Sequence, residues 1–160
     1  MLLTQNVDDL HARAVSDTGQ RLSADQIVQI HGDIFATRCS QCDFRRRDIN
    51  EQTNDVPLCP ECGALMRPGV VWFDEELDVN EVNRVENYLK GGPCEIVLVV
   101  GTTASFDYIV RWALAARGEN GQLIEVNPEE TPLSRYATAC VRKPAAKFLP
   151  EWVSSIIDTP

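Results

Sequence analysis

The sequence has no apolar run long enough to cross a bilayer, because its longest strongly apolar stretch, Ile96–Val100, has only five residues. The first residues, Met1 to Gln5, include no basic region and no long apolar stretch, so a secretory signal is not expected. Internal repeats and low-complexity segments are also absent from the sequence. These absences predict a cytoplasmic protein that has no membrane partner.

Positive charge is scarce. The chain has 15 Lys and Arg against 24 Asp and Glu, and its formal net charge is -9. An acidic surface repels a phosphate backbone, so nucleic acid is not expected as a partner. A cationic partner, such as a lysine-bearing peptide, suits it better. The one basic run, Arg45–Arg47, is expected to be a solvated loop.

Strand and helix patterns alternate through the second half of the chain. Near-continuous apolar segments predict buried strands over 95–100 and 122–126. Apolar residues at helical spacing predict a helix over 79–90, and further helical segments are expected over 106–117 and 147–157. This order predicts an α/β fold with a doubly wound, Rossmann-like parallel sheet and right-handed crossovers.

The first half of the chain is less regular. Residues 4–10 are expected to pass from a strand into a short helix with Asn6 or Asp8 as N-cap, and strands are expected over 27–30 and 70–73. Between them, residues 35–66 are rich in cysteine and charge and show little apolar periodicity. We therefore predict a partial Rossmann-like domain over 1–34 and 67–160, with an inserted module over 35–66.

Cysteine spacing in this module predicts a metal site. Cys39 and Cys42 form one C-x2-C pair, Cys59 and Cys62 form another, and residues 43–58 separate them. Four thiolates at this spacing bind Zn²⁺ tetrahedrally and leave no position for water, so the zinc would be structural. The other two cysteines, Cys94 and Cys140, adjoin apolar residues and are expected to be buried thiols.

Polar residues follow the two predicted buried strands. Gly101-Thr102-Thr103 comes after the first strand, where backbone amides and hydroxyls can hold a nucleotide; an ordinary strand-to-helix turn is the alternative. Asn127 ends the next strand, where its amide can pair with ribose hydroxyls, or where it simply begins an Asn-Pro turn.

The chain has two histidines. His31 lies between an apolar strand and a glycine, and an unperturbed pKa of about 6.5 suits a general base, although a lone histidine is more often structural. His11 is expected to be a partly exposed residue of the first short helix.

Six ordered motifs, from Thr4 to Glu129, resemble those of the sirtuin family, and the match continues to about Val153. They are Thr4-Gln5-Asn6-Val7-Asp8, Gln29-Ile30-His31-Gly32, the tetracysteine module, Arg67-Pro68-Gly69-Val70-Val71-Trp72-Phe73-Asp74-Glu75, Gly101-Thr102-Thr103 and Asn127-Pro128-Glu129. Each motif is weak alone, but their order around the cysteines makes coincidence improbable.

The resemblance implies an NAD-dependent protein-lysine deacylase, which transfers the acyl group to ADP-ribose and releases nicotinamide. It implies that His31 and Asn6 are catalytic and that an acylated lysine is the substrate. It implies two further sets of residues. Those that contact NAD are Gln5, Asn6, Asp8, Gly101, Thr102, Thr103, Asn127, Glu129 and Ala145. Those on the substrate side are Val71 and Phe73, as walls of an apolar tunnel, with Asp74 and Glu75.

The sequence departs from the family pattern in several places, and two of these departures bear on binding and assembly. Asp74 stands where the family has glycine, which is expected to alter peptide docking or to add a contact for a basic substrate. The family's G-A-G-x-S phosphate loop has no counterpart here, so exposed sheet edges and self-association are expected. The alternative function is a non-catalytic, zinc-bearing module that binds nucleotide or takes part in assembly.

Overall fold

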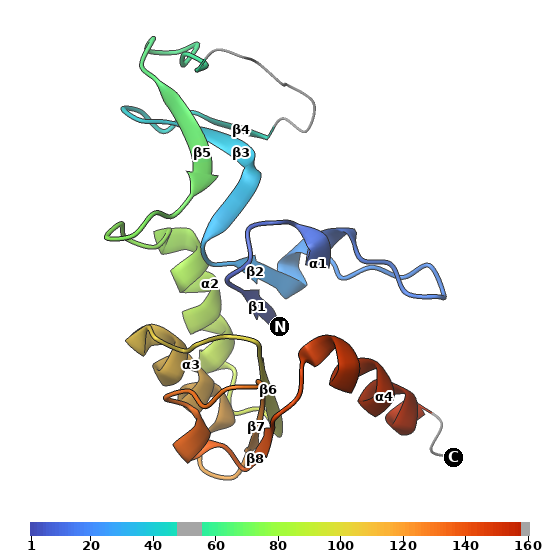
Figure 1. Ribbon diagram of the computed structural model, residues 1–160. Helices are drawn as coiled ribbons and strands as arrows, with labels where there is room; N and C mark the ends of the chain where they lie inside the picture. Colours follow the sequence, from blue (N-terminus) through green and yellow to red (C-terminus); the bar gives the residue numbers. More distant parts are fainter. Residues whose placement is uncertain (48–55, 158–160) are drawn as a thin grey trace. The chain divides into compact units, whose positions relative to one another are not determined.

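The computed structural model describes residues 1–47 and 56–157 of the chain, drawn in Figure 1. The chain divides into two compact units, Met1–Tyr88 and Leu89–Pro160. No helix within the described residues is long and apolar enough to cross a membrane. Part of the predicted module, residues 48–55, lies outside the described residues.

The first unit begins with two parallel strands. Strand β1 (Leu2–Thr4) pairs with β2 (Ile27–Gln29), and Thr4 lies opposite Gln29. Because the strands are parallel, the segments that follow them leave from the same edge. Helix α1 (Leu10–Arg13) and the 3-10 helix η1 (Ala24–Gln26) lie in the connection between the two strands.

The N-cap of α1 differs from the prediction. Asp9, and neither Asn6 nor Asp8, occupies this position, with left-handed backbone angles (φ 53°). The Asp8 carboxylate accepts a hydrogen bond from the Leu10 N–H at 3.1 Å, so it stabilises the same turn from one residue earlier.

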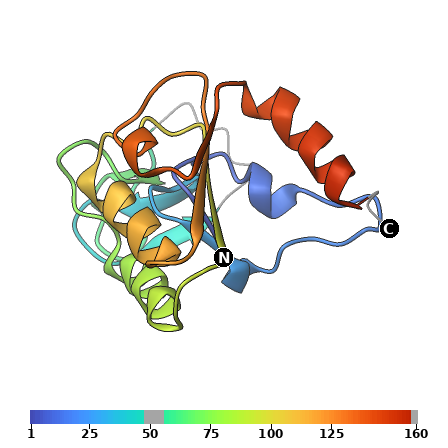
Figure 2. The ribbon, with the colours of Figure 1, turned by 90° about the horizontal axis from the view of Figure 1, so that it is seen from below.

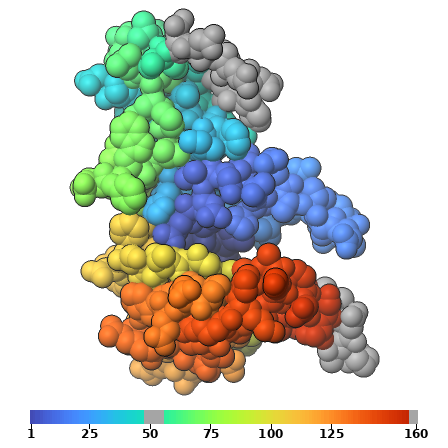
Figure 3. Space-filling model, viewed as in Figure 1, coloured from blue at the N-terminus to red at the C-terminus, as the bar shows by residue number. Residues whose placement is uncertain are grey.

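A three-stranded antiparallel sheet of order β4-β3-β5 extends beyond both ends of the predicted module; its strands are β3 (Gly32–Cys39), β4 (Arg45–Arg47) and β5 (Met66–Val70). Figures 1 and 3 show the residues of this sheet at one end of the first unit, and β3 ends at Cys39, the first of the four paired cysteines. Two expectations are wrong here. The basic run forms the strand β4 instead of a loop, although Arg45 and Arg47 remain exposed as expected, and the strand predicted over 70–73 ends at Val70.

A close approach of β3 and β5 requires glycine directly after His31. Gly32 has φ 87°, and a Cβ on it would lie 2.1 Å from the carbonyl oxygen of Gly69. Any larger residue would push the two strands apart. Gly32 thereby fixes where the chain turns from β2 into the module.

Helix α2 (Val79–Lys90) has the predicted bounds. Its buried residue is Val85, which is 1% exposed. Arg84 donates from α2 to the carbonyl oxygens of Ala24 at 2.9 Å and Ile27 at 2.8 Å. These bonds tie α2 to the start of β2.

The second unit confirms the predicted α/β alternation. Strands β6 (Ile96–Val100), β7 (Gln122–Val126) and β8 (Ala139–Val141) form a parallel sheet in that order, although β8 was not predicted. Helices α3 (Asp107–Arg117) and α4 (Ala145–Ile157) lie on opposite sides of this sheet (Figures 1 and 2). A short 3-10 helix, η2 (Ser134–Tyr136), precedes β8.

The core of this unit lies between the sheet and α3. Its buried members are Ala104, Ala113, Leu123 and Leu133. The prediction of burial on both faces is right for β7 but wrong for β6, because Ile96 is 53% exposed and the alternate residue Leu98 is 38% exposed. Cys140 is exposed and Cys94 is partly buried, so the expectation of a buried thiol fails at Cys140.

A buried carboxylate organises the loop between β7 and β8. Glu125 is 1% exposed and accepts hydrogen bonds from the Thr131 hydroxyl, from the Ser134 hydroxyl at 2.6 Å and from Arg142 at 2.7 Å. Arg142 also donates to the carbonyl oxygen of Asn127 at 3.2 Å. Burial alone raises the pKa of Glu125, but these hydrogen bonds outweigh burial and hold its pKa below the ordinary value.

We predict that Glu125→Gln destabilises the chain by about 1–3 kcal/mol at pH 7, because it leaves buried donors without a charged acceptor. The native carboxyl has a lowered pKa, so its contribution is complete above the unfolded pKa of about 4.3 and is lost as pH falls through the native value. Urea unfolding of both proteins between pH 7 and pH 3 measures this. A stability difference that stays constant over this range would contradict the prediction.

Candidate functional site

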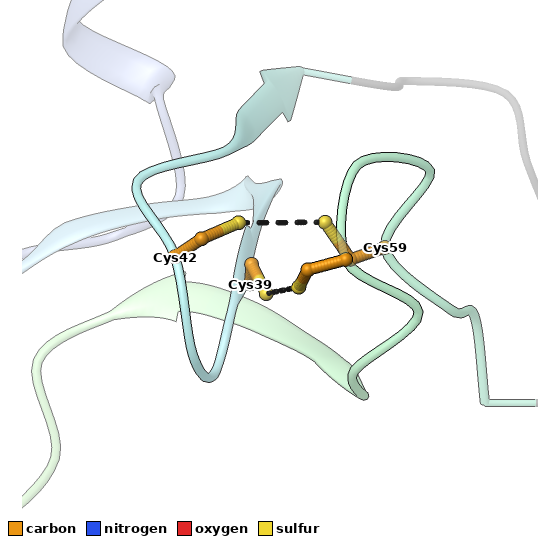
Figure 4. A group of neighbouring side chains, drawn as sticks. Cys39, Cys42 and Cys59 are labelled. Atoms are coloured by element: carbon orange, nitrogen blue, oxygen red, sulfur yellow. Dashed lines mark hydrogen bonds between the residues drawn. The ribbon is translucent and has the colours of Figure 1, made fainter.

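The four paired cysteines meet at one point. The Sγ atoms of Cys39, Cys42, Cys59 and Cys62 all lie within 4.8 Å of one another. Cys39 and Cys62 are 3.4 Å apart, and Cys42 and Cys59 are 3.6 Å apart (Figure 4). Tetrahedral zinc with Zn–S bonds of about 2.3 Å places its sulfurs about 3.8 Å apart. The cluster therefore fits a structural zinc ion, as the sequence predicted.

Local backbone bonds shape each cysteine pair into a tight turn. The Gln41 N–H donates to Cys39 Sγ at 3.3 Å, and this backbone hydrogen bond is the main cause that lowers the pKa of Cys39 to about 6. In the second pair, Cys59 N–H donates to the Ala64 carbonyl at 2.7 Å. Backbone amides that stabilise thiolates favour metal binding, because zinc binds the deprotonated sulfur.

His31 lies in the two-residue turn between β2 and β3, at the edge where β1 also ends. It is partly buried, and this desolvation is the main cause that lowers its pKa from the ordinary value, while a hydrogen bond with the backbone of Gln5 opposes the shift. The His31 carbonyl accepts a hydrogen bond from the Val71 N–H at 2.9 Å. His31 is thus held between the segment after β1 and the segment after β5.

The segment after β1 carries Gln5, Asn6 and Asp8. The Asn6 N–H donates to the Thr4 hydroxyl at 3.1 Å, and the Asn6 side chain is exposed. The Val7 carbonyl accepts from the Ile34 N–H at 3.0 Å, which joins this segment to the start of β3. The structure therefore places the Gln5–Asp8 segment beside His31 and the start of β3.

The segment after β5 is closed by Glu75. This carboxylate accepts from Arg67 at 2.5 Å, from Arg38 at 2.9 Å and from the Trp72 N–H at 3.0 Å. The hydrogen bond from Arg67 is the main cause that lowers the pKa of Glu75. Arg67 also stacks on the Trp72 ring, 4.0 Å from its centroid. The predicted substrate-side residue Glu75 therefore holds its own loop in place.

The tip of this loop is exposed. Phe73 is 90% exposed, and Asp74 has a left-handed backbone (φ 67°), which any residue other than glycine adopts at some cost. A cavity of about 690 Å³ adjoins the loop between β3, β5 and the start of α2, and Val71 is one of its lining residues. Phe73 is not among the described residues that line it.

In the second unit, Gly101–Thr103 and Asn127–Glu129 follow the adjacent parallel strands β6 and β7. Asn127 is 9% exposed; its Nδ2 donates to the Thr102 carbonyl at 2.7 Å, and its Oδ1 accepts from the Glu129 N–H at 3.1 Å. A side-chain amide has two donors and two acceptor positions, so one of each remains for a ligand. Ala145 begins α4, two residues before the start predicted for this helix.

Sequence reasoning missed the arginines that hold these segments. Arg38 and Arg67 neutralise Glu75, Arg45 pairs with Asp78 at 2.7 Å, and Arg47 pairs with both Asp9 and Asp33. The surplus of acids over bases concealed these pairs, since four of the five join residues that are 14 to 38 positions apart. Only the strand register of β3, β4 and β5 brings them together.

We predict that a zinc chelator releases one zinc ion per chain and unfolds the cysteine module, because the module has few apolar contacts of its own. Cys59→Ser should weaken zinc binding by more than about 100-fold, since losing even an outer partner of a ligand costs about 10- to 100-fold. Zinc content and near-UV circular dichroism measure both effects. The matched control is Cys94→Ser, which removes a thiol outside the cluster; zinc loss equal to that in Cys59→Ser would contradict the assignment.

Comparison with known proteins places the chain in one family. A family model described as "Sir2 family" matches residues 1–107. An NAD-dependent protein deacylase of Aquifex aeolicus is 36% identical over 149 residues, which cover 92% of this chain and 58% of that protein. One of Leptospira interrogans is 35% identical over 161 residues, which cover 99% and 61%.

The fold agrees with this similarity. A solved structure described as a Sir2 homolog–NAD complex superposes with a TM-score of 0.81 at 32% identity, and the match covers 98% of this chain and 57% of that one. This chain spans about three fifths of the length of the curated relatives that it matches. With the family model covering most of its length and the tetracysteine cluster in place, the chain belongs to the Sir2 family, the sirtuins.

Proposed function

We propose that this chain carries the substrate-side and ribose-side portion of an NAD-dependent protein-lysine deacylase. The observation that carries the proposal is His31, which lies partly buried between the Gln5–Asp8 segment and the Val71–Glu75 loop. The chain's relatives are named NAD-dependent protein deacylases, and these names support the same function. NAD would supply the ribose that accepts the acyl group and the nicotinamide that leaves.

His31 has the environment of a general base. Its lowered pKa keeps the imidazole neutral at neutral pH, so a ring nitrogen is available to accept a proton from a ribose hydroxyl. The hydrogen bond with the Gln5 backbone restricts the rotation of the ring. Asn6 and Asp8, on the same segment as Gln5, are suited to hold the hydroxyls and carboxamide of the nicotinamide riboside by hydrogen bonds.

The Val71–Glu75 loop would bind the acyl-lysine. The backbone of Val71 is joined to that of His31, so an acyl chain packed on Val71 would lie beside the proposed base. Phe73, which is 90% exposed here, offers apolar surface that a bound acyl chain would cover. Asp74 is exposed, and its carboxylate suits a peptide that carries positive charge near the modified lysine.

The second unit would bind the adenosine side of NAD. The spare donor and acceptor of Asn127 suit a ribose diol, and the turn at Gly101–Thr103 exposes backbone next to it. Glu129 follows Asn127 in the same loop, and Ala145 at the start of α4 would contact the base. These roles rest on the family resemblance together with the position of each residue at the end of a strand or at the start of a helix.

The relatives described above are named deacylases and do not favour the alternative of a non-catalytic binding module. Two further proposals accompany the main one. The exposed face of β6 would support self-association, since Ile96 and Leu98 expose apolar surface there. The cytoplasm is the proposed location.

The test is nicotinamide release by the zinc-loaded chain with NAD and an acetyl-lysine peptide. We expect His31→Gln to lower kcat/KM by about 10²- to 10⁴-fold, because a general base contributes that much. His11→Gln is the matched control, since it removes the other histidine, and should leave the rate within about twofold. Calorimetric titration with ADP-ribose should give equal affinities for the His31→Gln variant and the parent chain.

Asn127→Ala should weaken the binding of ADP-ribose, and Asn83→Ala, on the exposed side of α2, should not. Binding of ADP-ribose without nicotinamide release would favour the non-catalytic alternative. No heat from NAD or ADP-ribose, together with no released nicotinamide, would contradict both functions for this chain.

A further inference from the structure

One arginine of the cysteine module contacts both segments that carry the proposed catalytic residues. Arg47, the last residue of β4, donates through Nη2 to Asp9 Oδ2 at 2.5 Å and through Nε to Asp33 Oδ2 at 2.6 Å. Asp9 directly follows Asp8, and Asp33 lies two residues after His31. A single guanidinium therefore joins the segment after β1 to the segment after β2.

Asp9 depends on these contacts. Asp9 is 7% exposed, so its carboxylate has little contact with water. Its backbone is left-handed, which is strained for a residue other than glycine. Arg13 also donates to it, at 2.6 Å, and hydrogen bonds from Arg13 and Arg47 lower its pKa against the opposing effect of burial. Because the side chain of Arg13 is 60% exposed and comes from α1 itself, only Arg47 links Asp9 to a different segment among the contacts described here.

The first cysteine pair lies directly before β4, the strand that carries Arg47. The Cys39 N–H donates to the Phe44 carbonyl at 2.9 Å, which closes the first cysteine turn directly before β4. β4 then pairs with β3, with Arg47 opposite Ala36 and Arg45 opposite Arg38. A metal ion that holds Cys39 and Cys42 would therefore fix the start of the strand that presents Arg47.

We propose that Arg47 is a positioning residue that couples zinc binding in the module to the order of the Asn6–Asp9 segment and of His31. It acts through Asp9 and Asp33 and touches no reacting atom. The backbone bond between Val7 and Ile34 joins the same two segments and transmits the constraint. This inference deepens the proposed function, because the segments that Arg47 orders are those proposed to hold the nicotinamide riboside.

The chain offers a matched control in the same strand. Arg45 also belongs to β4 and also forms an ion pair, but its partner is Asp78, at the start of α2. Arg45→Met and Arg47→Met thus remove the same charge, from the same strand, and only the second breaks the link to Asp9 and Asp33. Asp9→Asn breaks the link from the other end without changing the module, and asparagine tolerates a left-handed backbone.

The experiment records NMR spectra of the zinc-loaded full chain, following the amides of residues 6–10 and the titration of the His31 ring. In Arg47→Met and Asp9→Asn we expect these amide signals to shift or broaden, and the His31 pKa to rise toward about 6.5 as the ring becomes solvated. Arg45→Met should resemble the parent chain. Arg47→Lys should lie between Arg47→Met and the parent chain in both signals. The lysine keeps the positive charge, but its ammonium lacks the fork that meets two carboxylates.

Zinc removal supplies the second arm. Chelation should shift the same signals in the parent chain, and should add little in Arg47→Met, because two changes on one path are not additive. In a ligand arm, Arg47→Met should weaken NAD binding by about 5- to 150-fold, the usual range for coupled sites. If the parent chain binds no NAD, the proposed function fails, while the NMR arm still tests the coupling.

Equal spectra for Arg47→Met and Arg45→Met would overturn the proposal, as would a His31 pKa that is unaltered by Arg47→Met, by Asp9→Asn and by chelation. Zinc content and far-UV circular dichroism identify a variant that does not fold. In that case Asp9→Asn, which leaves the module intact, decides the outcome by the same two signals.

Discussion

Arginine–carboxylate pairs are the interaction on which the first unit depends. Its functional segments are polar loops that contribute little to its buried apolar residues. Asp9 and Asp33 share Arg47, Glu75 receives both Arg38 and Arg67, and Asp78 receives Arg45. Bidentate and shared guanidinium contacts fix direction as well as distance, which a small apolar patch does not. These contacts therefore order loops that add few apolar residues of their own to the buried part of the unit.

The second unit solves the same problem with one buried carboxylate. Glu125 lies inside a parallel sheet whose apolar side packs on α3, and it gathers Thr131, Ser134 and Arg142 around itself. Arg142 also donates a hydrogen bond to the carbonyl of Asn127, and this bond fixes the start of the loop after β7. A charge buried at this depth is stable only with its partners present, which makes the loop conformation specific.

The sequence predicted the elements whose signals are local. The bounds of α2, the strands β6 and β7 and the four-thiolate cluster follow from periodicity and spacing, which need no knowledge of distant residues. The sequence analysis failed where strand pairing and neighbouring elements determine the structure. The run Arg45–Arg47 looks solvated until β4 pairs with β3, and β6 looks buried on both faces because its composition does not reveal which neighbours cover it.

The contrast between the two units explains why a zinc ion matters beyond its own ligands. In the second unit the sheet and α3 form a continuous core, and disturbing one loop leaves that core in place. In the first unit the module's core is Cys39, Cys59 and Met66, so the metal ligands and the packed residues are largely the same atoms. Releasing the metal would therefore remove ligation and packing together, and with them the strand that carries Arg45 and Arg47. A structural metal placed this way is connected to the loops through charge, and its loss would reach every carboxylate that those arginines hold.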